Sequence, residues 1–284
     1  MSTAESSPAD FSRLEEFDRY FELSVATSRQ QRKQVHEIRY RVYCKEFGYE
    51  PPEEFSNDRE VDEFDSQSVH CLVIHRESGL SVGCVRVVMV EGDDRMPMEA
   101  HAGDCIDRTF LDEFKGRRGT VCEISRLAVD AAFRRRRREQ GTRLGNIQAG
   151  DAIESERRTF PLIARSLMIG AGALADVLGR KHCFAIMEPF LPVMLRRAGI
   201  HFRRVGPDLE FHGVRAPYYG NLDELFDSAP AELRLYFNTM RDQFAAAIET
   251  TPQLPTQSEP RSLRVQGDRI NHLWWPELPG GSFA

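Results

Sequence analysis

The sequence lacks the patterns of several common protein classes. No apolar run approaches the roughly 18 residues of a membrane span. The first 17 residues, MSTAESSPADFSRLEEF, are acidic and have no apolar core, unlike a secretory signal. The net charge of −6 argues against general nucleic-acid binding, which usually requires a basic surface. These absences predict a cytoplasmic protein with no transmembrane segment and no nucleic-acid partner.

Two further absences concern cysteine and histidine. The six cysteines form no C-x-x-C pair, which favours reduced thiols over a disulfide framework. The eight histidines show neither H-E-x-x-H nor another ligand spacing, so we expect no metal and no bound cofactor. Cys122 has no evident base beside it, which favours a buried apolar role over a nucleophilic one.

What is present is the composition of a globular enzyme, with 41% hydrophobic and 29% charged residues. Ser28 and Gln31 form a capping-box pattern that predicts the start of a helix. The predicted elements are, in chain order, a helix at 28–47, strands at 69–75, 82–90 and 120–130, a long mobile loop at 131–160, a helix at 161–178, a strand at 181–189, a helix that Gly199 ends, a hairpin at 201–219 and an apolar helix at 228–249. This order indicates an α+β fold.

Two charged features of the N-terminal part need an explanation. Arg39 falls within the apolar stripe of the 28–47 helix. An inward arginine needs carboxylate or carbonyl partners, unless it snorkels to the surface. Residues 59–65, REVDEFD, are either a solvated acidic loop or the partners of such arginines.

The 120–130 strand is also unusual, because it carries Glu123 and Arg126 among apolar residues. Uncompensated burial of either charge is costly. Alternation places Glu123 on one face with Ser125, while Arg126 should point to the other face unless a β-bulge intervenes.

In their order and spacing, four segments resemble the acyl-homoserine lactone (autoinducer) synthases. These segments are IRYRVYCKEFGYE, EVDEFD, VGCVRVV and CEISRLAV. The corresponding family patterns are R-Y-x-V-F, E-x-D-x-[YF]-D, G-x-x-R and E-[LI]-S-R-[FL]-A-V. The resemblance covers about residues 17–215, and the matched positions are Arg39, Glu60, Asp62, Asp65, Arg86, Glu123, Ser125 and Arg126.

The resemblance implies a GNAT-type acyltransferase fold of the α+β class. In this fold a mixed twisted sheet, flanked by helices, opens into a V-shaped central cleft that binds a thioester donor. The implied organisation is a flexible N-terminus at 1–16, an acyltransferase domain at 17–215 and a C-terminal helix and tail at 216–284.

The resemblance also assigns roles to the matched residues. Glu123 would act as the base and Ser125 would assist the oxyanion. The arginines Arg39, Arg86 and Arg126 would pair with Glu60, Asp62 and Asp65 to shape an acceptor pocket. Two alternatives remain open: one arginine holds an acceptor carboxylate, or the network only fastens the helix and the acidic run to the sheet.

The sequence departs from the autoinducer synthases in its Arg-rich loop and C-terminal region. Both are more similar to long-chain N-acyl amino acid synthases and to the acyltransferases associated with the PEP-CTERM/exosortase system. Residues 138–143, REQGTR, match the GNAT phosphate loop [RQ]-x-x-G-x-[GA] only in part, which favours acyl carrier protein over coenzyme A as the donor. The loop arginines, which form either a carrier-protein contact or a solvated loop, are Arg134, Arg135, Arg136, Arg137 and Arg138.

The resemblance therefore implies an N-acyltransferase. It would move a fatty acyl group from an acyl carrier protein or CoA thioester to the amine of a small amino-acid-like acceptor, in an exosortase-associated system. One alternative is an acyl-homoserine lactone synthase that uses S-adenosylmethionine. The other is a non-catalytic protein that binds an acyl chain or acyl carrier protein.

Overall fold

The computed structural model describes residues 17–102, 106–134, 160–227 and 229–251. Strand β1 (Phe21–Val25) is followed by helix α2 (Arg29–Arg39), which continues as a π-helical segment, Tyr40–Glu46. The capping box is present, because Gln31 N–H donates to Ser28 Oγ and Ser28 N–H donates to Gln31 Oε1. The helix predicted at 28–47 is confirmed, with a π-helical second half.

Among the described residues, eight strands form one sheet in the order β1-β2-β3-β4-β5-β8-β6, and β7 pairs with β8. Every pair is antiparallel except β4–β5, which is parallel. The later strands are β2 (Ser68–His75), β3 (Ser81–Met89), β4 (Val121–Val129), β5 (His182–Met187), β6 (Arg203–Arg204), β7 (Leu209–Glu210) and β8 (Val214–Asn221). The predicted mixed sheet is confirmed.

The sheet opens between its two parallel strands. β4 and β5 pair only from Val121↔His182 to Glu123↔Phe184. Beyond this point both strands continue without pairing to each other, and a cavity lies between them. The V-shaped central cleft is thus confirmed, with Glu123 and Phe184 at its closed end.

A β-bulge in β4 changes the direction of Arg126. The register with β3 shifts from Arg86↔Ser125 to Cys84↔Ala128, so extra residues of β4 lie opposite a single residue of β3. Arg126 itself has φ 50°, in the left-handed region. Strict alternation would direct Ser125 and Arg126 to opposite faces. With the bulge, Arg126 contacts Asp62 of the acidic run directly, and Ser125 is connected to Asp62 through Arg86.

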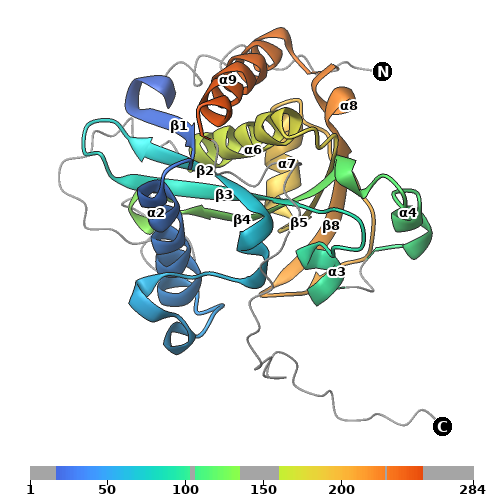
Figure 1. Ribbon diagram of the computed structural model, residues 1–284, viewed down its shortest axis with the longest axis horizontal. Helices are drawn as coiled ribbons and strands as arrows, with labels where there is room; N and C mark the ends of the chain where they lie inside the picture. Colours follow the sequence, from blue (N-terminus) through green and yellow to red (C-terminus); the bar gives the residue numbers. More distant parts are fainter. Residues whose placement is uncertain (1–16, 103–105, 135–159, 228, 252–284) are drawn as a thin grey trace.

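Helices cover both faces of the sheet (Figure 1). α6 (Phe160–Val177) packs on one face, with α9 (Ala231–Glu249) against it, and α2 packs on the other face. Alternation along β2 supplies both layers, because Cys71 and Val73 join the α6 side while Leu72 joins the α2 side. The shorter helices are α3 (Pro97–His101), α4 (Arg108–Asp112), α5 (Ala131–Arg134), α7 (Phe190–Arg197) and α8 (Leu222–Asp227).

The C-terminal part shares the main core with the sheet. The strand β8 crosses the expected boundary after residue 215. The apolar face predicted for the last helix is confirmed, because Leu233, Phe237 and Phe244 of α9 are buried in the cluster that contains α6. In the described part of the chain, no helix has both the length and the apolar character of a membrane span.

Gly199, which follows α7, generates a prediction about stability. Its φ is +85°, and an added Cβ would lie 2.6 Å from Cδ of Pro230. We expect Gly199→Ala to lower the free energy of unfolding by about 2–4 kcal/mol, because it adds a clash to left-handed backbone strain. Urea denaturation measures this change.

Gly48 provides the matched control, because its φ is +62° but its Cβ position is open. Gly48→Ala should lose only about 1–2 kcal/mol from the backbone strain. Equal losses in the two variants would show that the contact with Pro230 contributes nothing.

Candidate active site

Arg39 of α2 is the centre of a buried ion-pair network. Its side chain is fully buried. Its Nε donates to Glu60, and its Nη1 donates to Asp65 Oδ1 at 2.5 Å. Nη2 lies 3.7 Å from Asp62 Oδ2. The inward position predicted for this arginine is confirmed, and the acidic run supplies its partners.

Arg86 of β3 joins the same carboxylates to the central strand. It is fully buried, and its Nη1 lies 2.5 Å from Asp62 Oδ1 and 3.4 Å from Asp65 Oδ1. Its Nε donates to Ser125 Oγ at 3.0 Å. The acidic run therefore contacts both α2 and β3, and through Arg86 it is connected to β4.

Arg126 completes the network from the bulge of β4. Its Nε lies 3.2 Å from Glu60 Oε1, and its Nη2 lies 3.1 Å from Asp62 Oδ2. Nη2 also lies 3.3 Å from Glu50 Oε1. Sequence reasoning missed Glu50, which stands outside the matched acidic pattern and is brought to Arg126 only by the fold.

The acidic run forms a tight turn that presents its carboxylates inward. Asp62 is the N-cap of the 3₁₀ segment Glu63–Gln67, and its side chain accepts from Phe64 N–H. Asp62 N–H donates to Asp65 Oδ2 at 2.8 Å. Glu63 is exposed, as expected for the one residue of this run without a predicted partner.

The electrostatic environment keeps the run ionised. Burial opposes ionisation of Asp65, but Arg39 and the His70 hydrogen bond outweigh it, so the pKa of Asp65 lies well below its usual value. Glu60 and Asp62 also have lowered pKa values, because nearby arginines outweigh burial. Burial raises the pKa of Glu50 to about 7, although Arg126 partly offsets this.

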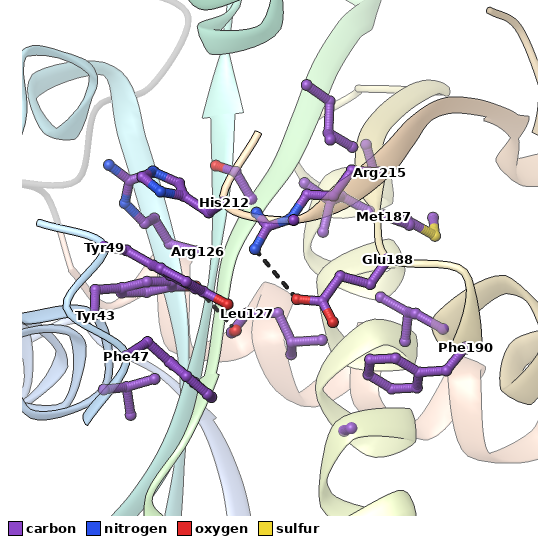
Figure 2. A pocket seen from close by; sticks show the side chains of 18 of the residues that line it. Tyr43, Phe47, Tyr49, Arg126, Leu127, Met187, Glu188, Phe190, His212 and Arg215 are labelled. Carbon is purple, nitrogen blue, oxygen red and sulfur yellow. Dashed lines mark hydrogen bonds and ion pairs between the residues drawn. The ribbon is translucent and has the colours of Figure 1, made fainter. Parts of the chain in front are cut away.

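The cleft between β4 and β5 has a volume of about 380 Å³. Figure 2 shows Tyr43, Tyr49 and Arg126 on one side of it and Glu188 and Arg215 on the other. Tyr43 O–H donates to the Leu127 carbonyl at 3.0 Å, which ties the π-helical segment to β4. Sequence reasoning missed this lining, because the two sides of the cleft come from segments far apart in the chain.

Glu123 lies at the closed end of the cleft, on the same strand face as Ser125. It is 3% exposed, and its Oε2 accepts the Met98 N–H at 2.8 Å. Burial raises the pKa of Glu123 to about 8, against the lowering effects of the Met98 N–H and Arg86. Ser125 lines the cavity directly, whereas Glu123 lies deeper, at the last β4–β5 pair. A carboxyl with this pKa can exchange a proton with an amine.

The structure thus brings together all the predicted site residues of the helix, the acidic run and the two strands. Arg134 ends α5, and Arg135–Arg138 lie outside the described residues. Within the described ranges, His36, Asp65 and His70 hold potential ligand atoms within 4.8 Å of one another. Asp65 already accepts from Arg39, whose charge opposes a metal cation there.

The network leads to a prediction for Asp65→Asn. Removing one carboxylate leaves buried arginines undercompensated, so we expect the free energy of unfolding to fall by about 3–5 kcal/mol at pH 7. We also expect lower catalytic activity. Urea denaturation and a thioester-turnover assay measure the two effects.

Glu63→Gln is the control in the same turn, and it should change stability by less than about 0.5 kcal/mol. A depressed carboxyl pKa stabilises the fold above the unfolded-state pKa of about 3.9 for Asp, and this contribution is lost as the pH falls further. The wild type should therefore lose stability below about pH 4 more steeply than Asp65→Asn. Wild-type activity and stability in Asp65→Asn would contradict a role for the network.

Residues 38–142 match the family model described as the acetyltransferase (GNAT) domain. The matched range contains the last two residues of α2, the acidic run and strands β2 to β4, and it includes every residue of the ion-pair network. A search of curated protein sequences found no match.

Among solved structures, the chain is similar to TofI in a ternary complex with an inhibitor and MTA. The TM-score is 0.53 at 18% identity, with 75% of this chain and 96% of that chain covered. Two further similar structures are the AHL synthase LasI (TM-score 0.49, 14% identity, 75% and 98% covered) and FeeM, an N-acyl amino acid synthase from uncultured soil microbes (TM-score 0.47, 11% identity, 74% and 94% covered). The likeness to TofI shows a shared fold. The match to the domain model over residues 38–142 identifies the protein as an acyltransferase with a GNAT domain.

Proposed function

We propose that the protein is an N-acyltransferase. It moves a fatty acyl group from a thioester to the amine of a small amino-acid-like acceptor. The observation that carries this proposal is Glu123, a buried carboxyl with its pKa raised to about 8, at the closed end of a cleft between diverging strands. Such a group is suited to take a proton from an amine.

The reaction begins with loss of the amine proton to the Glu123 carboxylate, directly or through water. The amine nitrogen then attacks the thioester carbonyl carbon, and a tetrahedral oxyanion forms. Backbone N–H groups on the edge of β4 beyond Glu123, where pairing with β5 has ended, can donate to this oxyanion, and Ser125 assists. The C–S bond then breaks, and the leaving thiolate takes a proton from the attacking nitrogen, which gives a neutral amide and a thiol. Glu123 releases the proton that it accepted to solvent.

The ion-pair network fixes the acceptor side of this site. Each of its three arginines already contacts at least two carboxylates. Two guanidinium nitrogens of the network, Arg39 Nη2 and Arg86 Nη2, are buried and have no hydrogen-bond partner in the described part of the chain. Arg39 Nη2 still lies 3.7 Å from Asp62 Oδ2, so the better candidate for a ligand contact is Arg86 Nη2. We infer that this atom contacts the acceptor carboxylate, while the other arginines hold the pocket in shape.

For the donor we propose acyl carrier protein, with acyl-CoA as the alternative, and a cytoplasmic role in an exosortase-associated system. The carrier protein would contact the arginines at 134–138. This part rests on the partial match to the phosphate loop and on the resemblance of the loop and C-terminal region to that branch.

Substitution of Glu123 tests the base assignment. Glu123→Gln keeps the size of the side chain but removes the base, so we expect N-acylation to fall at least about 100-fold. Thiol release from acyl thioesters, measured with a panel of amino acids, reports the rate. Binding of the thioester donor and the melting temperature should be retained.

Glu22→Gln, at an exposed position of β1, is the matched control and should keep full activity. The wild-type kcat/KM should rise with pH up to an inflection near pH 8, because only the ionised carboxylate accepts a proton. In Glu123→Asp this inflection should move, because a shorter carboxyl has a different environment. Full activity in Glu123→Gln would remove Glu123 as the base.

Lipid extracts of cells that overproduce the protein identify the product. We expect mass spectrometry to detect an N-acyl amino acid or a related amide, which gives chain length and acceptor together. Release of methylthioadenosine with a lactone product would instead indicate the S-adenosylmethionine-dependent reaction. Donor binding without turnover of any acceptor would indicate a non-catalytic protein.

A further inference from the structure

Arg215 differs from the other arginines of the cleft in its charge balance. The arginines of the network each contact several carboxylates, whereas the one carboxylate in ion-pair contact with Arg215 in the described chain is Glu188, at 3.2 Å. Glu188 is 43% exposed, so this pair is weak and open to exchange. Arg215 is 15% exposed, and its buried Nε has no hydrogen-bond partner among the described residues.

Aromatic rings flank the Arg215 guanidinium, which lines the cleft beside Glu188 (Figure 2). Its Cζ lies 5.5 Å from the centroid of the Tyr49 ring and 5.8 Å from that of Phe211. Tyr49 is itself stacked on His212 at 4.6 Å. Contact with the rings orients the guanidinium without using its N–H groups. These groups can therefore donate to a phosphate or a carboxylate.

The distance from the closed end of the cleft distinguishes these two anions. Glu188 directly follows the end of β5 and lies four residues after Phe184, the partner of Glu123. Four extended residues span roughly 13 Å. The carboxylate of an α-amino acid is only two bonds from its reacting nitrogen, so it cannot lie at Arg215 while the amine is beside Glu123. A pantetheine arm is long enough between its thiol and its phosphate to span this distance.

We propose that Arg215 binds the phosphate at the far end of the pantetheine arm of the donor, exchanging its contact with Glu188 for this phosphate. The arm then runs through the cleft and places the thioester near Ser125 and Glu123. This inference rests on the proposed acyl transfer and adds the element that anchors the donor. Both acyl-CoA and acyl carrier protein carry this phosphate, so the proposed contact with Arg215 is the same for either donor.

The test compares three donors with the same acyl chain: acyl-CoA, acyl carrier protein and acyl-pantetheine, which lacks the phosphate. In Arg215→Gln, the KM for the two phosphate-bearing donors should rise about 10- to 100-fold, as for loss of a charged hydrogen bond. The KM for acyl-pantetheine and for the amine acceptor should equal the wild-type values. A larger effect for one of the phosphate-bearing donors identifies which source the site favours.

Glu188→Gln is the matched variant, because it removes the competing carboxylate and leaves Arg215 free. It should lower the KM for the phosphate-bearing donors. An equal loss with acyl-pantetheine in Arg215→Gln would mean that Arg215 only supports the cleft, and an increase confined to the acceptor KM would mean that it binds the acceptor. Either result overturns the proposal.

Calorimetry separates this proposal from the proposed function. Phosphopantetheine should bind the wild-type protein more tightly than pantetheine, and Arg215→Gln should abolish the difference. If no donor supports N-acylation but this binding difference persists, the proposed reaction fails and the phosphate site stands. If the wild type binds both compounds equally, the phosphate site is excluded, whatever the activity.

Discussion

The structure depends on the burial of the Arg39 guanidinium. An arginine inside a protein is stable only when carboxylates compensate its charge. Glu60 and Asp65 provide this compensation, and Asp62 extends the network to Arg86 and Arg126. Three segments far apart in sequence are thereby held together: helix α2, the acidic run and the central strands. A well-packed apolar cluster of similar volume often gives equal stability, so stability alone does not account for the network.

The second constraint is the end of pairing between β4 and β5. Parallel strands joined over only three residue pairs leave the following backbone edges without sheet partners. These edges form the walls of a cavity in which a linear substrate can lie along the strands. Arg126 of the network lines this cavity, and Tyr49 and Arg215 line it as well. The β4 bulge at Arg126 connects the two constraints, because it lines the cavity and also reaches Glu60.

The proposed chemistry follows from the contrast between two kinds of carboxylate. Asp65 lies among arginines, so its pKa is depressed and it stays ionised. Glu123 is equally enclosed but is compensated mainly by one backbone N–H, so burial dominates and its pKa rises to about 8. One group is therefore suited to a structural role and the other to proton transfer. Environment, rather than residue type, separates the two functions.

The sequence by itself determined the elements and much of the network. Apolar periodicity located α2, β2 to β4 and α9, and the inward position of Arg39 required carboxylate partners that the spacing of REVDEFD could supply. Only the tertiary structure decided the rest. Strict alternation directs Arg126 away from Ser125, and the bulge that reverses this depends on the register with β3. Glu50, Tyr49, Glu188 and Arg215 carry no local signal, because their contacts join separate segments of the chain. Arg215 and Glu188 are 27 residues apart, and Arg126 and Glu50 are 76 residues apart. Local patterns report the burial of a side chain, whereas its partners are set by how distant segments pack.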